Sequence, residues 1–260
     1  MHRILKSVFA LGALAVLAVP AAAEPAAKPT VVLVHGAFAD ASSWNEVVAR
    51  LEKDGYPVVA VANPLRGVKS DGDYVGRIVA GIKTPVVLVG HSYGGSVISE
   101  AAVETKNVEA LVYVAAFAPE KGESAADLSG KFPGSTLAPT LAEPVALANG
   151  GKDLYIRQDK FHDQFAADVP AKAAKLMAAT QRPITEAALT EGAPGAAWQT
   201  IPSWFIYGDA DKNIPAKALG WMAERAHSRE TVVVKGASHV VMVSHPDKVA
   251  KIIEDAASAK

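Results

Sequence analysis

The sequence contains no cysteine, which excludes disulfide bonds and thiolate-ligated metal sites. It has no basic arm or stripe, and 26 Lys and Arg against 27 Asp and Glu argue against a nucleic-acid partner. After residue 23 no apolar run reaches the roughly 20 residues that a transmembrane helix needs. What remains is an ordinary globular composition. With 260 residues, half of them apolar, the chain can bury a large core as one α/β domain with an insertion or as two domains.

The N-terminal 23 residues differ from the rest of the chain. Arg3 and Lys6 precede an apolar run at 8–19, and three alanines then precede Glu24. A basic start, a short apolar centre and small residues before a cleavage site are typical of a secretory signal peptide. An uncleaved membrane anchor is the alternative, although the apolar run is short for a span. We expect cleavage before Glu24, a short leader at 24–29, no stable membrane insertion of the mature chain, and a periplasmic or secreted protein.

Strand-like and helix-like segments alternate in two parts of the mature chain, 30–117 and 201–260. Strands separated by helices imply parallel pairing with right-handed crossovers. The predicted fold class is therefore α/β, with a doubly wound, mostly parallel sheet whose ligands bind at the carboxyl ends of the strands. Asp71 is expected to cap one of the helices. The expected strands are 31–34, 57–62, 85–89, 108–115, 203–207 and 231–234.

Regularity fails between these two parts, at residues 118–200. Seven prolines interrupt this segment, among short helical pieces such as 171–180. Because it shows no strand pattern and lies between strands of the sheet, we interpret it as a helical cap inserted over the sheet. A separate small domain is the alternative.

A serine stands between glycines directly after the strand-like run 85–89. The sequence Gly90-His91-Ser92-Tyr93-Gly94-Gly95 predicts a strand, a very tight turn and then a helix. Glycines on both sides of the serine let the strand and the helix approach without Cβ clashes. Such a short pattern also occurs by chance, and Ser92 is then only a turn residue.

A nucleophilic serine needs a base, and the base needs an acid that fixes its tautomer. His239 follows the last expected strand, so it lies at the same edge of the sheet as Ser92. Two aspartates, Asp209 and Asp211, follow the strand 203–207 and compete for the role of the acid. Asp209 comes directly after a glycine, where an aspartate side chain commonly shapes a turn.

Four motifs in one order resemble the α/β-hydrolase superfamily, and within it the small serine esterase and hydroxynitrile-lyase-like group. The resemblance covers residues 30–258. The motifs are Val-Leu-Val-His-Gly-Ala at 32–37, Gly-His-Ser-Tyr-Gly-Gly at 90–95, Tyr-Gly-Asp-Ala-Asp at 207–211 with Ile214-Pro215, and Gly-Ala-Ser-His at 236–239.

The resemblance implies a catalytic triad of Ser92, His239 and Asp211, the last because it stands four residues before a proline. It also implies that the backbone N–H groups of Ala37 and Tyr93 form the oxyanion hole. An ester, the expected small-molecule substrate, would be cleaved through an acyl-enzyme without a metal or organic cofactor. Phe38 is expected to line the substrate pocket. Further walls could come from Phe117, Phe161, Met177 and Trp198, each of which could equally be a core residue. Of these four we select Phe117 and Trp198 as the predicted pocket residues beside Phe38.

Other uses of the same fold remain as alternatives. Hydroxynitrile lyases of this group place a lysine after the catalytic histidine, where this chain has Val240, and dehalogenases and epoxide hydrolases carry an aspartate in place of Ser92. Perhydrolase activity shares the triad, and the fold can also serve as a ligand-binding protein. We expect His35 to shape the oxyanion loop, and His162 to be a surface residue or a substrate contact. The predicted function is a serine carboxylesterase for small to medium apolar esters.

Overall fold

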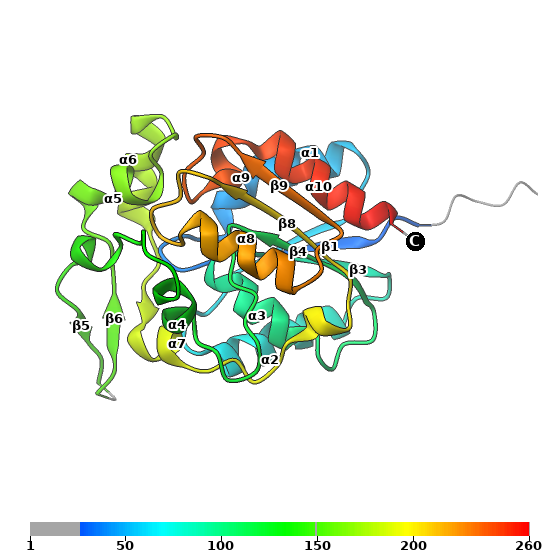
Figure 1. The fold of residues 1–260 in the computed structure, drawn as a ribbon. Helices are drawn as coiled ribbons and strands as arrows, with labels where there is room; N and C mark the ends of the chain where they lie inside the picture. Colours follow the sequence, from blue (N-terminus) through cyan, green and yellow to red (C-terminus); the bar gives the residue numbers. More distant parts are fainter. Residues whose placement is uncertain (1–26, 149, 260) are drawn as a thin grey trace, which may run out of the picture.

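A computed structural model describes residues 27–148 and 150–259 (Figure 1). The predicted signal peptide, residues 1–23, and the first part of the leader lie outside the described residues. The centre of the molecule is a six-stranded sheet in the order β2-β1-β3-β4-β8-β9, with every neighbouring pair parallel. Its strands are β1 (Thr30–Val34), β2 (Val58–Val61), β3 (Val86–His91), β4 (Val108–Val114), β8 (Ser203–Gly208) and β9 (Glu230–Val234).

The inner strands are continuous apolar runs because helices cover both faces of the sheet. Every residue of β1, β3 and β8 is buried, whereas the edge strands β2 and β9 are partly exposed. The chain passes from β1 outward to β2 and then crosses back to β3 on the other side of β1. The strand order therefore reverses between β1 and β3, and a crevice forms at the carboxyl ends of such a pair.

Two layers of helices enclose the sheet (Figure 1). One face carries α1, α9 and α10, the other α2 and α3, and α8 packs against β8. The helices of the core are α1 (Asn45–Lys53), α2 (Val68–Ala80), α3 (Tyr93–Ala101), α8 (Ala216–Arg225), α9 (Val241–Ser244) and α10 (Pro246–Ser258), with a 3₁₀ turn, η1 (Ala41–Trp44), before α1. Within the described ranges no helix is long and apolar enough to cross a membrane.

Helix α2 begins earlier than expected, because it starts before Asp71, its predicted cap residue. Gly67 is its cap residue, and Asp71, expected at that place, lies within the first turn. The Asp71 carboxylate still accepts hydrogen bonds from the backbone N–H groups of Arg66 and, at 3.4 Å, Gly67. Asp71 therefore accepts hydrogen bonds at the N-terminus of α2, although it lies inside the helix and is not its cap residue.

Most of the segment between β4 and β8 lies beyond the carboxyl ends of the sheet strands, whereas its last turn, η3 (Ala197–Gln199), lies beside α3 (Figure 1). The segment contains the expected helices and also a small antiparallel sheet, β5-β6-β7, which was not expected. These strands have only two or three residues, too few to show an alternating pattern. The elements of the insertion are α4 (Ala125–Gly130), η2 (Ala138–Thr140), β5 (Val145–Ala146), β6 (Lys152–Leu154), α5 (Gln158–Phe165), α6 (Ala171–Thr180), β7 (Ile184–Thr185), α7 (Glu186–Thr190) and η3 (Ala197–Gln199).

Candidate active site

Ser92 occupies a strained turn between β3 and α3. Its φ of 53° and ψ of −122° are rare for a residue with a side chain, and such strain persists only where the surroundings fix it. A Cβ atom at Gly90 would lie 2.5 Å from the Gly94 carbonyl oxygen, and one at Gly94 would lie 2.5 Å from that of Val34. Only glycines allow this approach, so the glycine pattern has the steric reason inferred from the sequence.

His239 and Asp211 form a buried pair at the ends of β9 and β8. The distance from His239 Nδ1 to Asp211 Oδ2 is 2.6 Å, and the two side chains are 1% and 0% exposed. The other carboxylate oxygen accepts hydrogen bonds from the backbone N–H groups of Asn213 (2.8 Å) and Ile214 (3.0 Å). Because the carboxylate accepts at Nδ1, that nitrogen carries the proton and Nε2 of neutral His239 is left as the acceptor.

Asp209, the competing aspartate, has a different partner. Its Oδ1 accepts a hydrogen bond from the backbone N–H of Gly236 at 2.6 Å, which ties the turn after β8 to the turn after β9. The structure thus pairs His239 with Asp211 and gives Asp209 the turn-shaping contact expected of it.

Ser92 and His239 line the same cavity, whose volume is about 240 Å³. Ala37, Phe38, Tyr93 and Phe117 line it too, so two of the three predicted pocket residues face it. No Lys, Arg, Asp or Glu of the described chain is among its lining residues. The remaining walls are apolar or neutral: Ala125, Ala126, Ser129, Ser135, Leu137, Ala138, Leu141, Phe165, Leu189, Asn213 and Ile214.

Trp198, the third predicted pocket residue, does not line this cavity. Its indole N–H donates to the Pro119 carbonyl oxygen at 2.8 Å, and the Arg225 guanidinium lies 5.3 Å from the ring centre. It is a structural residue at the base of the insertion. Of the other candidate walls, Phe161 is buried against Phe165, and Met177 lines a neighbouring cavity.

The two residues predicted to donate oxyanion hydrogen bonds lie beside Ser92. Tyr93 is the first residue of α3, and the first N–H groups of a helix have no acceptor within it. Ala37 follows β1, which pairs with β3 so that Val34 is opposite Gly90. The reversal of strand order thus brings both residues to the wall of one cavity.

A family model described as the alpha/beta hydrolase family matches residues 31–252. The chain belongs to this family. Among curated relatives, the alpha/beta hydrolase nvfD of Aspergillus novofumigatus is 29% identical over 252 residues, covering 88% of this chain and 97% of nvfD. The alpha-hydroxynitrile lyase of Arabidopsis thaliana is 24% identical over 239 residues, covering 84% of this chain and 92% of the lyase. The crystal structure of polyneuridine aldehyde esterase matches with a TM-score of 0.76 at 20% identity, over 88% of this chain and 98% of that one. The resemblance to the esterase and hydroxynitrile-lyase-like group is confirmed.

Two aromatic rings of this α/β hydrolase hold the imidazole of His239. Phe165, at the end of α5 in the insertion, lies 5.1 Å from it between ring centres, and His91, next to the serine, lies 4.8 Å from it. Phe165 was missed in the sequence, although it stands four residues after Phe161 on the same helix face, which is the spacing of a buried stripe. The insertion therefore contributes directly to the surroundings of the candidate base.

His91 is a fully buried neighbour of His239. Its Nε2 lies 3.1 Å from the His239 carbonyl oxygen, and since a carbonyl only accepts, this nitrogen carries the proton. Burial lowers the pKa of His91 well below its usual value, and the nearby His239 lowers it further. The His91 ring therefore stays neutral beside the candidate base.

His35 holds the loop that carries Ala37 in this hydrolase. Its Nε2 accepts a hydrogen bond from the Asn63 backbone N–H (3.1 Å), so Nδ1 donates to the Gly36 carbonyl oxygen (2.9 Å). Burial lowers the pKa of His35 to about 4. These contacts agree with the expected structural role. His162 contacts the Val169 carbonyl oxygen at 2.8 Å within the insertion and is not among the residues that line the catalytic cavity.

Proposed function

We propose that this α/β hydrolase is a serine carboxylesterase in which Ser92 is the nucleophile, His239 the general base and Asp211 the acid. Membership of the family supports a hydrolase in general. The observation that carries the finer assignment is the buried bond between His239 Nδ1 and Asp211 Oδ2, beside a strained serine that lines the same cavity. A base with a fixed tautomer next to a serine is the arrangement that nucleophilic acyl transfer needs.

In this mechanism His239 Nε2 takes the proton of Ser92, and the serine oxygen bonds to the carbonyl carbon of the ester. The backbone N–H groups of Ala37 and Tyr93 stabilise the negative charge on the carbonyl oxygen. The bond to the alcohol oxygen breaks, and His239 returns the proton to the departing alcohol. A water that gives its proton to His239 then attacks the acyl-enzyme, and the acid leaves as Ser92 is reprotonated. Asp211 remains a carboxylate throughout.

The cavity supports small to medium, uncharged, apolar esters as substrates. A charged group would lose its hydration there without meeting an opposite charge, because the described lining has no ionic side chain. The volume of about 240 Å³ suits an acyl group of modest size. A lyase is less well supported, because the residue after His239 is the fully buried Val240, which has no group that could exchange a proton with cyanide.

Labelling with an organofluorophosphonate tests the proposal, together with turnover of short-chain aryl esters by the mature protein. We expect a covalent adduct at Ser92, and loss of both adduct and turnover in Ser92→Ala. If well-folded protein shows neither, the chain is not a serine esterase. Ligand-dependent thermal stabilisation that survives Ser92→Ala, without ester turnover above background, would instead identify a ligand-binding protein.

For the N-terminal segment we propose cleavage after Ala23 and export to the periplasm or the medium, as its composition suggests. Mass spectrometry of the exported protein should then find a chain that begins at Glu24. An intact chain with Met1 in the membrane fraction would contradict cleavage and favour an anchor.

A further inference from the structure

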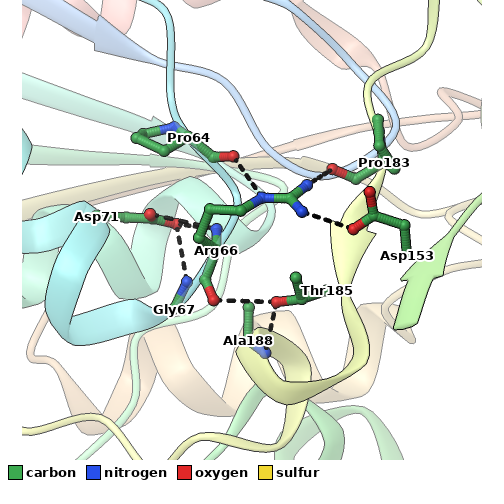
Figure 2. Close-up of polar contacts among 8 residues, drawn as sticks. All are labelled: Pro64, Arg66, Gly67, Asp71, Asp153, Pro183, Thr185 and Ala188. Carbon is green, nitrogen blue, oxygen red and sulfur yellow. Dashed lines mark hydrogen bonds and ion pairs between the residues drawn. The ribbon is translucent and has the colours of Figure 1, made fainter. Parts of the chain in front are cut away.

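A polar joint connects the insertion to the loop between β2 and α2 (Figure 2). The Arg66 guanidinium donates to Asp153 Oδ1 of β6 at 2.6 Å and to the Pro183 carbonyl oxygen at 3.0 Å. Its Nε donates to the Pro64 carbonyl oxygen of its own loop at 3.1 Å. One side chain thus holds two segments of the insertion against the core.

Backbone contacts reinforce this joint. The Thr185 N–H donates to the Leu65 carbonyl oxygen at 3.2 Å. The Thr185 hydroxyl donates to the Arg66 carbonyl oxygen at 3.0 Å (Figure 2). Leu65 is fully buried with a φ of 62°, a conformation that is rare for leucine and persists only when its surroundings impose it. The loop is therefore held in one arrangement by the insertion.

Asp71 connects this loop to the core behind the serine. Its buried carboxylate accepts hydrogen bonds from the Arg66 N–H, at 3.2 and 3.0 Å to its two oxygens, and from the Tyr93 hydroxyl at 2.9 Å. Burial raises the pKa of Asp71 and that of the Tyr93 phenol. The phenol consequently keeps its proton and remains the donor of this bond.

The side chain and the backbone of Tyr93 contact different parts of the molecule. Its hydroxyl ends the chain of contacts that begins at Asp153 in the insertion, and its backbone N–H follows Ser92 at the wall of the catalytic cavity. A donor to an oxyanion must be aimed before the reaction begins, because a small displacement removes much of its effect. Anchoring the side chain of Tyr93 restricts how far its backbone can move.

We propose that Arg66 and Asp71 are positioning residues that link the insertion to Tyr93 and hold its backbone N–H at the oxyanion. The inference rests on the proposed function, in which that N–H stabilises the oxyanion. Neither residue is among those that line the catalytic cavity. Their loss acts on the chemical step, so kcat falls while KM is nearly unchanged, as for an interaction made only in the transition state.

A double-mutant cycle between the two ends of the network tests this inference. The aryl-ester kcat and KM are measured for wild type, Arg66→Met, Tyr93→Phe and the double variant. We expect each single change to lower kcat by roughly threefold to tenfold, about the effect of one hydrogen bond, with KM changed less than about twofold. The double variant should lose no more than the worse single variant, because either change already breaks the link.

Two substitutions elsewhere serve as matched controls. Arg225 also joins the core to the insertion, with two bonds to Glu123 at 2.9 and 2.8 Å, and Arg225→Met removes such a pair away from Tyr93. Tyr113 has an equally buried hydroxyl, bonded to Ser99 at 2.8 Å, and Tyr113→Phe removes it. We expect both controls to lower the melting temperature while kcat stays within about twofold of wild type.

Arg66→Lys provides a further variant should Arg66→Met fold poorly, because an ammonium can keep the contact with Asp153 and loses those with the two prolines. An intermediate kcat supports the link. Two results overturn the link. One is a double variant whose loss of kcat equals the product of the two single losses. The other is an Arg66 variant that, like Arg225→Met, loses thermal stability without losing kcat. Wild-type protein without turnover or phosphonate labelling overturns the proposed function and this inference together, whereas an active wild type with multiplying losses overturns the inference alone.

Discussion

At the residue scale, the assignment of the acid is the sharpest point to test. Asp211→Asn keeps the size of the side chain but no longer imposes the proton on His239 Nδ1, so Nε2 is not reliably free to act as the base. We expect kcat to fall by about 10³ or more. Asp209→Asn is the matched control, since the Asp209 carboxylate accepts a hydrogen bond from the Gly236 N–H and is not the partner of His239, and its kcat should stay within about tenfold of wild type. A larger loss in Asp209→Asn than in Asp211→Asn would reverse the assignment.

Two buried histidines make a second residue-scale prediction, on stability and pH. Burial lowers the pKa of His35 from 6.5 to about 4 and that of His91 well below 6.5. As the pH falls below 6.5, these histidines therefore bind protons in the unfolded chain before they do so in the folded one. Their contribution to stability is therefore present above pH 6.5 and lost as the pH falls towards 4. Each group adds up to about 1.4 kcal/mol per pH unit to the slope of the unfolding free energy. Urea unfolding at several pH values should show a smaller slope for His35→Gln than for wild type; equal slopes would contradict the prediction.

The position of a residue could be predicted from the sequence only where the order of the strands along the chain determines which residues it meets. Ser92 and His239 follow recognisable strands, so parallel pairing alone brings them to one edge of the sheet. Phe165 and Arg66 owe their positions to how the insertion folds back on the core, and no spacing in the sequence records which side chains meet there. Trp198 has the structural role that was left open as its alternative, because a buried aromatic residue that packs in the core and one that lines a cavity have the same sequence pattern.

At the scale of elements, strands buried on both faces were predictable because their apolar runs are long and uninterrupted. The start of α2 was not, because the group that completes its N-terminus comes from the insertion. The Glu191 carboxylate accepts hydrogen bonds from the backbone N–H groups of Val68 (2.6 Å) and Lys69 (3.3 Å). A helix capped by a residue more than a hundred positions away has no local signal at its first turn.

This remote cap leads to a prediction for α2. Glu191→Ala leaves the N–H groups of its first turn without their acceptor and removes a negative charge from the positive end of the helix dipole, so the unfolding free energy should fall by about 1 kcal/mol. Glu143→Ala is a suitable control, because Glu143 is an exposed residue of the insertion that lies outside its helices. Urea unfolding of both variants measures the difference, and equal losses would show that Glu191 does not act as a cap.

At the scale of the whole molecule, the sequence left open whether residues 118–200 form a cap or a separate small domain. The insertion meets the core through polar contacts on several sides as well as through Phe165 against His239. Besides the joint at Arg66, these contacts include Arg225 with Glu123 and, at 2.7 Å, Gln164 Nε2 with Asn213 Oδ1. The apolar side chains of the insertion, Phe161 and Phe165 among them, also belong to the same buried cluster as those of the core, and a shared apolar core favours one cooperative unit.

We therefore expect the insertion and the core to unfold together. Calorimetry of the mature protein should show a single transition in which the calorimetric and van't Hoff enthalpies agree. Hydrogen exchange at low denaturant concentration should give the slowest amides of α6 in the insertion and those of α10 in the core similar opening free energies, because one cooperative unit exposes both. An insertion that opens several kcal/mol more easily than the core, or a separate thermal transition, would identify a domain with its own stability. The joint at Arg66 would then act as a contact between two units, and Arg66→Met should separate the two transitions further.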